Sequence, residues 1–349
     1  MSPAGLEASG GTIYNQRIAA QWGAAVEYVP GGWPLPHDAH RARLLDLLLA
    51  GSQQDSVLLD GLIGSAAPDE VAAARDAGVR IVILVHLPLP AETGLTSAEQ
   101  EQLAAWEARA LGVASAVACT SSWAARDLGR RYGLGDVAVA EPGTDPQPLA
   151  CGSRPVQLIT PASFTPRKNH RLLIEALASP VLADLDWHAL WLGADPTGSA
   201  REELSYGVAA AGLADRVRLN AARTGTDLDA AWASSDLVLL PSLTETYAMV
   251  VTEGLARGIP AVVGAGTAAE DTLRGGASPL RHGVTTPGSG MPGEALATDD
   301  PSSWAATIAG WLTSADLRDQ WRWAATQRRD QLSAWSVPAG ILAGLMRAQ

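Results

Sequence analysis

Basic residues, cysteines and long apolar runs are scarce in this sequence of 349 residues. The 25 lysines and arginines are outnumbered by 37 aspartates and glutamates, which gives a formal net charge of −12. We therefore expect neither general nucleic-acid binding nor binding to anionic membranes, because both need a dominant basic surface. A phosphorylated substrate would have to be bound by positive charge concentrated in one place.

The two cysteines, Cys119 and Cys151, do not make a disulfide framework, and neither has a partner at metal-ligand spacing. A reducing cytoplasm is the expected compartment. No run approaches the roughly 20 apolar residues that span a bilayer. The first residues, MSPAGLEASGG, lack a signal-peptide pattern. We expect a cytoplasmic protein without stable membrane insertion.

Strand-like and helix-like patterns alternate along a chain that is long enough for two globular domains, with 47% hydrophobic and 18% charged residues. Such alternation is typical of βα units around a parallel sheet. The predicted strands are 26–29, 56–59, 80–86, 115–120, 137–140, 156–160, 187–192, 216–219, 236–240 and 261–263. The predicted helices are 13–22, 39–50, 69–77, 97–111, 122–132, 169–177, 199–211, 247–257, 301–312, 315–328 and 334–346.

The stretch from Pro241 to Pro260, PSLTETYAMVVTEGLARGIP, carries two glutamates around an apolar helical segment. Glu245 is predicted just before the helix, at the end of a buried strand, and Glu253 about two turns inside it. Ligands of parallel α/β sheets bind at the carboxyl ends of strands, where helix N-termini favour phosphates. The alternative is that Glu245 is a helix-start acid favoured by the helix dipole and Glu253 a solvated helix residue.

This stretch resembles the Glu-x7-Glu motif of the family-4 retaining glycosyltransferases, including an aromatic at Tyr247. The resemblance implies that Glu245 contacts the donor sugar, with a catalytic role, and that Glu253 contacts the nucleotide ribose. The diphosphate would be bound by backbone N–H groups at Ala248, Met249 and Val250. Ala248 stands where the family usually has glycine, and its methyl group slightly narrows the approach of the backbone to a donor.

Gly10 and Gly11 lie at the start of a predicted helix that Ser9 or Thr12 would cap. Two glycines let a ligand approach the backbone closely, although such pairs are often simple turns. In the resembling family this loop faces the donor phosphates and the acceptor, which implies a binding role for both glycines. Residues 1–8 contain no strand-like run, so we expect either a missing first strand or a misassigned start site.

His86 ends the apolar run VRIVILVH, at the carboxyl end of a predicted strand. A histidine in such a place is often structural, because its imidazole readily finds a backbone partner. The resembling family carries a histidine on the corresponding strand, next to the transferred sugar. The resemblance therefore implies that His86 contacts the donor sugar in catalysis.

Lys168 is predicted at a helix start, where the helix dipole disfavours a cation unless an anion binds there. On this reasoning, Lys168→Ala should raise or preserve the stability of the ligand-free protein. In the resembling family the matching lysine binds the diphosphate together with an arginine five or six residues earlier, where this sequence has Ala162 and Ser163. Arg167 either supplies the second charge or is a surface residue.

The resemblance implies the α/β GT-B fold, in which two Rossmann-like parallel-sheet domains face each other across a cleft. The expected division is 1–148 for an acceptor-side domain, 149–330 for the nucleotide-sugar domain and 331–349 for a helix that returns to the first domain. The segment 141–145 resembles the crossing between domains, and Trp335 resembles a tryptophan near the start of the last helix. Glu270 resembles an acid of the family, and the segment 283–290 resembles one of its turns. Four tryptophans are predicted to be core or helix-packing residues and not a platform for a sugar, namely Trp304, Trp311, Trp321 and Trp323.

We expect an enzyme that transfers a sugar from a nucleotide diphosphate sugar, either a UDP- or a GDP-sugar, to an unidentified acceptor hydroxyl or amine. The resemblance implies retention of the anomeric configuration. No cofactor or metal is expected, so Lys168, Arg167 and backbone N–H groups would neutralise the leaving diphosphate. The alternatives are a sugar-nucleotide-binding protein without turnover and a glycoside phosphorylase.

Overall fold

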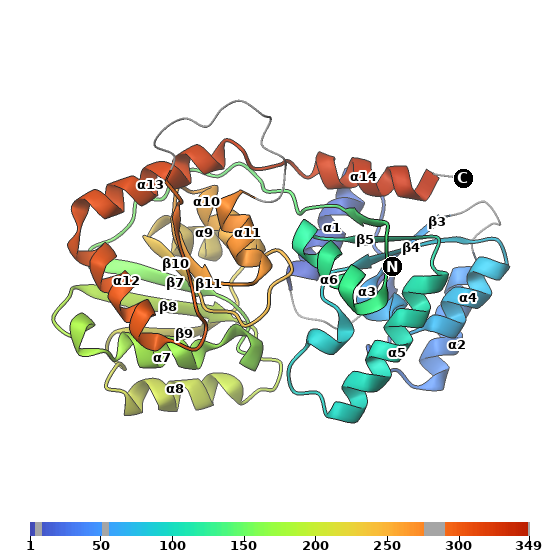
Figure 1. Ribbon diagram of the computed structural model, residues 1–349, viewed down its shortest axis with the longest axis horizontal. Helices are drawn as coiled ribbons and strands as arrows, with labels where there is room; N and C mark the ends of the chain where they lie inside the picture. The colour runs from blue at the N-terminus through green and yellow to red at the C-terminus, as the bar shows by residue number, and fades with distance from the viewer. Residues whose placement is uncertain (4–8, 51–55, 276–289, 348–349) are drawn as a thin grey trace. The chain divides into compact units, whose positions relative to one another are not determined.

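The computed structural model describes residues 1–3, 9–50, 56–275 and 290–347, which form two compact units (Figure 1). Residues 1–143 and 333–349 make up the first unit, and residues 144–332 the second. The structure thus divides the chain a few residues before the expected boundary at 148. Of the segment 283–290, only Gly290 lies within the described residues.

The first unit contains a parallel sheet in the order β3-β4-β5-β6. A second parallel pair joins β1 to β2. These strands are β1 (Ser2–Pro3), β2 (Tyr28–Val29), β3 (Ser56–Asp60), β4 (Arg80–Val85), β5 (Ala116–Cys119) and β6 (Val137–Val139).

The expectation that the first strand is missing is wrong. The amino nitrogen of Met1 donates to the Leu58 carbonyl at 2.6 Å, and the Asp60 N–H donates to the Met1 carbonyl at 3.0 Å. β1 therefore runs between β2 and β3. Its two residues, one of them a proline, are too short a run to carry a strand pattern, and the neighbouring strands supply the pairing instead.

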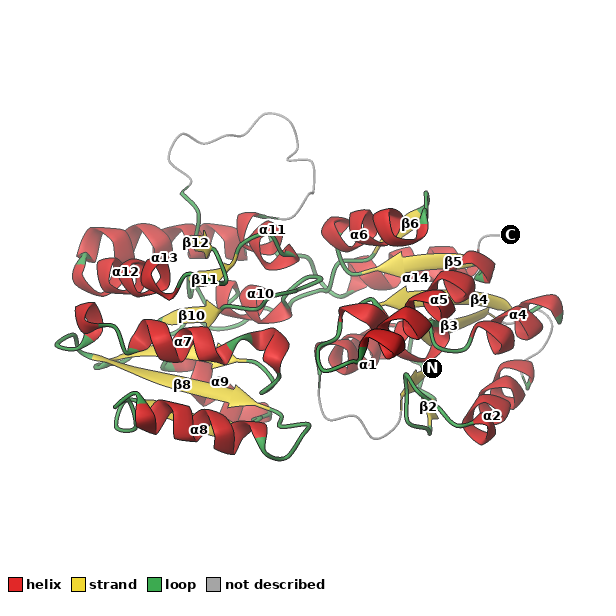
Figure 2. Ribbon diagram, turned by 60° about the horizontal axis from the view of Figure 1, so that its bottom comes forward, coloured by secondary structure: helices red, strands yellow, loops and turns green. Residues whose placement is uncertain are grey.

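Helices cover the sheet of the first unit (Figure 2). They are α1 (Gly10–Gln21), α2 (Asp38–Leu49), α3 (Gly61–Gly64), α4 (Pro68–Asp76), η1 (Leu89–Ala91), α5 (Ser97–Val113), α6 (Ser122–Tyr132) and α14 (Ser336–Arg347). The cap of α1 is Ser9, whose hydroxyl accepts the Thr12 N–H at 3.2 Å. The last helix, α14, packs on α1, β3 and β4, which confirms the expected return of the C-terminal helix to the first domain.

The second unit is built on a parallel sheet in the order β12-β11-β10-β7-β8-β9. The chain begins this sheet at β7 and places later strands on both sides of it, so β7 and β10 flank the point where the winding reverses. The strands are β7 (Val156–Pro161), β8 (Trp187–Gly193), β9 (Val217–Ala221), β10 (Leu237–Leu240), β11 (Ala261–Gly264) and β12 (Gly293–Leu296). Ligands of such sheets bind outside the carboxyl ends at this switch point.

Alternate residues of these strands point to two separate hydrophobic cores. Leu237 and Leu239 of β10 join one core, while Val238 and Leu240 join the other. Strands buried on both faces explain the continuous apolar runs in the sequence. The helices of this unit are η2 (Pro166–Lys168), α7 (His170–Leu177), η3 (Pro180–Leu182), α8 (Ala200–Ala210), α9 (Gly225–Ala233), α10 (Met249–Leu255), α11 (Ala268–Arg274), α12 (Pro301–Thr313) and α13 (Ala315–Arg329).

The structure differs from the predicted elements of this unit in several places. α9, α11 and β12 were not predicted, and α10 is shorter at both ends than the predicted helix 247–257. Trp304, Trp311 and Trp321 are buried as expected, whereas Trp323 is 48% exposed and does not belong to the core. Trp323 shares its helix with Trp321 but lies two residues away, which places it on a different face.

His170, the first residue of α7, is buried between two aromatic rings. Its ring centroid lies 5.3 Å from those of both Phe164 and Trp191. Neither ring nitrogen has a hydrogen-bond partner among the described residues. Burial, with a smaller contribution from the charge of Lys168, lowers the pKa of His170 to about 3. The folded protein therefore holds this histidine neutral.

We expect His170 to make the protein sensitive to acid. Its pKa is about 6.5 in the unfolded chain and about 3 when folded, so its neutral form contributes fully above pH 6.5. That contribution is lost as the pH falls from about 6.5 toward 3, at up to about 1.4 kcal/mol per pH unit. His170→Leu should reduce the slope of the unfolding free energy between pH 6 and pH 4.

Urea unfolding at several pH values measures this slope. His188→Leu makes the same change at an exposed position of β8 and serves as the control. If both variants lowered the slope equally, the acid sensitivity would not come from His170.

Candidate active site

In the second unit, the loops that follow β7 and β10 meet through an ion pair. Nζ of Lys168 lies 2.5 Å from Oε1 of Glu245, and the guanidinium of Arg167 lies 3.9 Å from Oε2 of the same carboxylate. Arg167 also donates to the Thr244 carbonyl at 3.0 Å, and its own carbonyl accepts the Leu243 N–H at 2.9 Å. Three predicted site residues are thus brought together at the switch point of the sheet.

Glu245 is almost fully buried, so its ionisation depends on its neighbours. Burial alone would raise the pKa of Glu245, but the charges of Lys168 and Arg167 and the hydrogen bond from Lys168 outweigh it, so the pKa is lowered. Lys168 is the only lysine in the sequence. A compact ammonium group therefore stands at this one position of a chain that otherwise uses arginine for positive charge.

The position of Lys168 corrects one premise of the sequence analysis. Lys168 ends η2 and lies two residues ahead of α7, whose cap Asn169 has a left-handed φ of 54°. The anion beside Lys168 is Glu245, so no external anion is needed to explain a cation here. The reason for expecting Lys168→Ala to raise or preserve stability therefore no longer holds. We now expect a loss of stability, because the change would leave a buried carboxylate without its nearest cation.

Ala248 caps α10 in a left-handed conformation, with φ 73° and ψ 68°. This backbone explains a preference for glycine at the position, because the conformation strains any residue that has a Cβ. It also explains why α10 begins only at Met249. Val250 lies in the same first turn, and Glu253 follows in the middle of the helix, half-buried.

In the first unit, His86 follows β4 and lies against the first turn of α1. A Cβ atom on Gly11 would come within 3.1 Å of Cδ2 of His86, so the glycine permits the contact. Gly10 is the first residue of the same helix. Two further residues that the sequence analysis did not select, Asn15 and Asp60, approach Nε2 of His86 at 3.0 and 3.7 Å.

Asn15 and Asp60 carried weak signals in the sequence. Asn15 lies one helical turn after Gly11, on the same face of α1. Asp60 is the last residue of β3 and His86 the first residue after β4, so both lie at the carboxyl ends of neighbouring strands. Burial lowers the pKa of His86, and the charge of Asp60 offsets only part of this effect. The imidazole is therefore neutral near pH 7.

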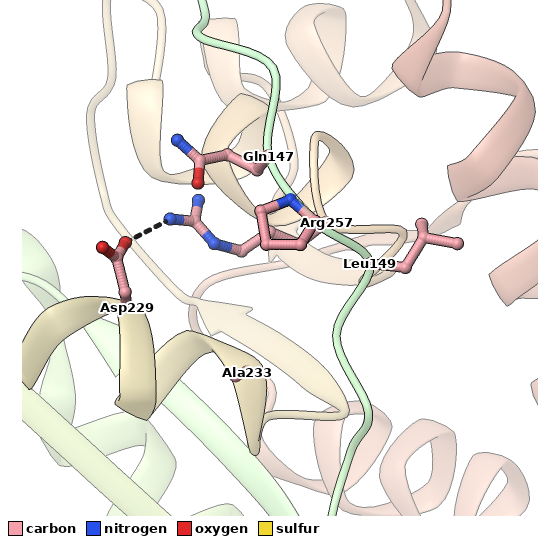
Figure 3. Close-up of a pocket in the computed structure, with 6 residues that line it drawn as sticks. Gln147, Leu149, Asp229, Ala233 and Arg257 are labelled. Carbon is pink, nitrogen blue, oxygen red and sulfur yellow. Dashed lines mark hydrogen bonds and ion pairs between the residues drawn. The ribbon is translucent and has the colours of Figure 1, made fainter. Parts of the chain in front are cut away.

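A cavity of ≈ 120 Å³ in the second unit lies near the amino ends of β10 and β11, away from the carboxyl ends that carry the ion pair (Figure 3). It is bordered by Ala233, which ends the helix before β10, and by Arg257, which follows the end of α10. Arg257 donates to Asp229 across this space at 3.0 Å. The cavity is thus separate from the cluster at the carboxyl ends and is spanned by an internal ion pair.

Within the described ranges, no three His, Cys, Asp or Glu side chains gather in a way that could hold a metal ion. None of the helices described is both long enough and apolar enough to cross a membrane. Burial raises the pKa of Cys119 to about 12, so this thiol stays protonated and unreactive.

The fold matches solved structures of the GT-B class along nearly the whole chain. HepE of Anabaena, solved in complex with UDP and glucose, is similar with a TM-score of 0.75 and 16% identity, over 100% of this chain and 98% of HepE. Sucrose-phosphate synthase of Thermosynechococcus elongatus gives a TM-score of 0.74 and 17% identity, over 99% of this chain and 94% of that structure. The chain, with its two parallel-sheet α/β domains, therefore has the GT-B fold.

Residues 144–328, more than half of the chain, match the family described as glycosyl transferases group 1, and the chain belongs to this family. D-inositol 3-phosphate glycosyltransferase of Salinispora tropica is 33% identical over 165 residues, which are 44% of this chain and 30% of that protein. The Salinispora arenicola protein of the same name is 30% identical over 126 residues, or 35% of this chain and 25% of that protein. The matches thus span less than a third of the length of these curated relatives.

We expect the Lys168–Glu245 pair to stabilise the ligand-free protein. Lys168→Met should lower the free energy of unfolding by about 1–3 kcal/mol, because the carboxylate of Glu245 stays buried without its nearest cation. The same change should have a much smaller effect in a Glu245→Gln background. Urea unfolding of this double-mutant cycle measures the coupling, with Arg171→Met on the exposed side of α7 as the control. Simple additivity of the two changes would show that the pair does not stabilise the protein.

We expect Ala248→Gly to stabilise the protein by up to about 1 kcal/mol, because glycine adopts the left-handed conformation without strain. Ala256→Gly is the matched control at the other end of α10, where the residue has an ordinary right-handed φ of −58°. This control should destabilise by about 0.5–1 kcal/mol. Thermal and urea unfolding compare the two variants, and a loss of stability in both would show that Ala248 is not strained.

Proposed function

We propose that the protein transfers a sugar from a nucleotide diphosphate sugar to an acceptor hydroxyl or amine, with retention of the anomeric configuration. The observation that carries this proposal is the buried Glu245 held by Lys168 and Arg167 at the switch point of the second sheet. Two cations and a carboxylate at this edge suit a ligand that combines a diphosphate with sugar hydroxyls. Membership of the glycosyl transferases group 1 family supports the same reaction class.

In this proposal, Lys168 and Arg167 neutralise the diphosphate, and the N–H groups of Ala248, Met249 and Val250 bind its oxygens. Glu245 accepts hydrogen bonds from the donor sugar, and Glu253 accepts them from the ribose. Gly10 and Gly11 let the backbone of α1 approach the ligand, and His86 contacts the sugar.

The ligand-free pair has a direct consequence for donor binding. Lys168 already has one anionic partner at 2.5 Å, and a diphosphate would be a second. The ammonium group has three donors, so it can serve both anions without leaving Glu245 unpaired. Lys168 would thus bind the diphosphate and orient the carboxylate that receives the sugar.

We propose that the reaction proceeds on one face of the sugar. The bond between the anomeric carbon and the phosphate oxygen breaks, and the bond to the acceptor oxygen or nitrogen forms on the same side. The proton of the acceptor passes to the leaving phosphate oxygen, so no side chain is required as a general base. Lys168 and Arg167 stabilise the charge that develops on the diphosphate, without a bound metal.

We propose a UDP- or GDP-sugar as the donor. The similar HepE structures include complexes with UDP and with UDP-glucose, which supports UDP as the first nucleotide to test. A thermal-shift screen with UDP, GDP, ADP and their common sugars identifies the donor, because a ligand at 100 times its Kd adds roughly 2.7 kcal/mol of stability. Release of free nucleotide diphosphate from the donor then measures turnover, and binding without any release would favour a binding protein.

Two glutamate variants test the proposed roles. Glu253→Ala should weaken binding of the free nucleotide by roughly 10- to 100-fold, because a ribose hydroxyl loses a charged acceptor worth about 1.5–3 kcal/mol. Glu245→Gln should leave nucleotide affinity nearly unchanged but lower kcat for transfer.

Calorimetry and steady-state kinetics separate these effects. Glu175→Ala, at an exposed position near the end of α7, is the control. Equal losses of nucleotide affinity in the Glu253→Ala and Glu245→Gln variants would contradict the division of roles.

A further inference from the structure

A second cavity adjoins the one that Arg257 and Asp229 border, near the amino ends of β10 and β11. It has a volume of ≈ 150 Å³, and it shares Leu149 and Arg257 with the first cavity, whose volume is ≈ 120 Å³. The second cavity is also lined by Arg322, from the middle of α13, and by Asp236, which precedes β10. Two arginines from separate segments of the second unit thus border the same cavity.

The side chain of Arg257 is only 8% exposed, yet much of its hydrogen-bonding capacity is unused. Its guanidinium donates to the Glu253 carbonyl at 3.1 Å and to Asp229 at 3.0 Å. These bonds use two of the five N–H donors of an arginine, which leaves three without a hydrogen-bond partner among the described residues. Burial lowers the pKa of Arg257, although the charges of Glu253 and Asp229 act in the opposite direction. A buried cation with unused donors favours a ligand that brings acceptors.

The two acids beside these arginines differ in how firmly they are held. Asp236 is buried, and one of its oxygens accepts the N–H groups of Ser153 and Gln157, both at 3.0 Å. Its other oxygen accepts from Arg322. The side chain of Asp229, in contrast, is 64% exposed, so water screens its ion pair. The acceptor of Arg257 is thus an acid that can move into water, and a ligand with acceptor oxygens can take its place.

We propose that these two cavities form a binding site for a small anion of the phosphate class, held between Arg257 and Arg322. The inference goes beyond the proposed sugar transfer and does not depend on it. The cavities lie near the amino ends of the strands, whereas the Lys168–Glu245 pair lies at the carboxyl ends.

The shape and size of the site favour phosphate over other anions. A planar guanidinium binds two oxygens of one anion in a parallel pair of hydrogen bonds. One arginine therefore occupies both oxygens of a carboxylate, whereas a tetrahedral phosphate has oxygens for two arginines. Each cavity exceeds the roughly 30 Å³ that a water molecule takes up in the liquid, but each is below the roughly 300–1,000 Å³ of pockets for larger ligands.

A bound phosphate would connect segments that are far apart in the sequence. Arg257 follows α10 and Arg322 belongs to α13. The side chain of Gln147 lies beside the guanidinium of Arg257 and adds an amide that can donate (Figure 3). The carbonyl of Gln147 already accepts from Arg329 of α13 at 2.6 Å. We therefore expect phosphate to stabilise the second unit and to raise the melting temperature of the protein.

Calorimetric titration with inorganic phosphate tests the site. Arg257→Met should lower the affinity for phosphate by roughly 10- to 100-fold, the effect of losing hydrogen bonds to a charged group. The variant should fold, because the carboxylate that it leaves behind, Asp229, is largely in water. Arg218→Met makes the same change at an exposed position of β9 and should keep the wild-type affinity. An unchanged affinity in Arg257→Met would overturn the proposal.

Asp229→Asn gives a test of opposite sign. The change removes a negative charge that competes with the ligand for Arg257, so the affinity for phosphate should rise about fivefold. The arginine stays in place, so this variant tests the site even if Arg257→Met does not fold. An unchanged or weaker affinity in Asp229→Asn would overturn the proposal.

Three further titrations separate this site from other effects. Phosphate beside Lys168 would also follow from the proposed function, so the Arg257-dependent binding should persist in Lys168→Met. Potassium chloride at equal ionic strength measures the screening of surface charges, and an equal rise in melting temperature with chloride would overturn the site. Glycerol 3-phosphate distinguishes the free ion from a phosphate monoester: the tighter of the two probes identifies the source, and Arg257-dependent binding of neither overturns the site. If no nucleotide sugar binds, the proposed function fails while these titrations still decide the anion site.

Discussion

A buried carboxylate remains ionised in the second unit only because two cations come with it. Glu245, Lys168 and Arg167 lie on two loops that are distant in sequence and adjacent in the sheet, and their ion pair holds these loops in register. The backbone hydrogen bond between Leu243 and Arg167 fixes the same two loops. The arrangement of the loops at the carboxyl ends of these strands therefore depends on an electrostatic contact, while burial of the apolar strands supplies most of the stability.

Both units place an acidic side chain from the end of one strand near a basic side chain from another segment. In each, an acid at the end of a buried strand or just after it is linked to a basic group from another segment. Glu245 pairs with Lys168, and Asp60 contacts Asn15, which in turn contacts Nε2 of His86. In the second unit the result is a concentration of charge. In the first it is a neutral imidazole ring.

The sequence predicted the architecture well because the central strands β4, β8, β10 and β11 are largely buried on both faces and stand out as apolar runs. The prediction failed where contacts between distant segments determine the local structure. β1 is a strand because it pairs with its neighbours, and the left-handed backbone at Ala248 makes α10 begin two residues later than predicted. The roles of Glu245 and Lys168 were assigned from local spacing, which could not reveal their contact. Asn15 and Asp60 escaped notice because such residues commonly cap helices and turns, and only the folded chain brings them to His86.

Because the sequence contains one lysine, the second unit has a single side chain that an amine-selective reagent can label. A reagent selective for amines would meet a single side-chain target, and that target is the ammonium group closed against Glu245. Because the side chain of Lys168 is only 15% exposed, its rate of modification measures how often the pair opens. The protein thus carries its own reporter of local motion at the edge of the sheet, without any engineered label.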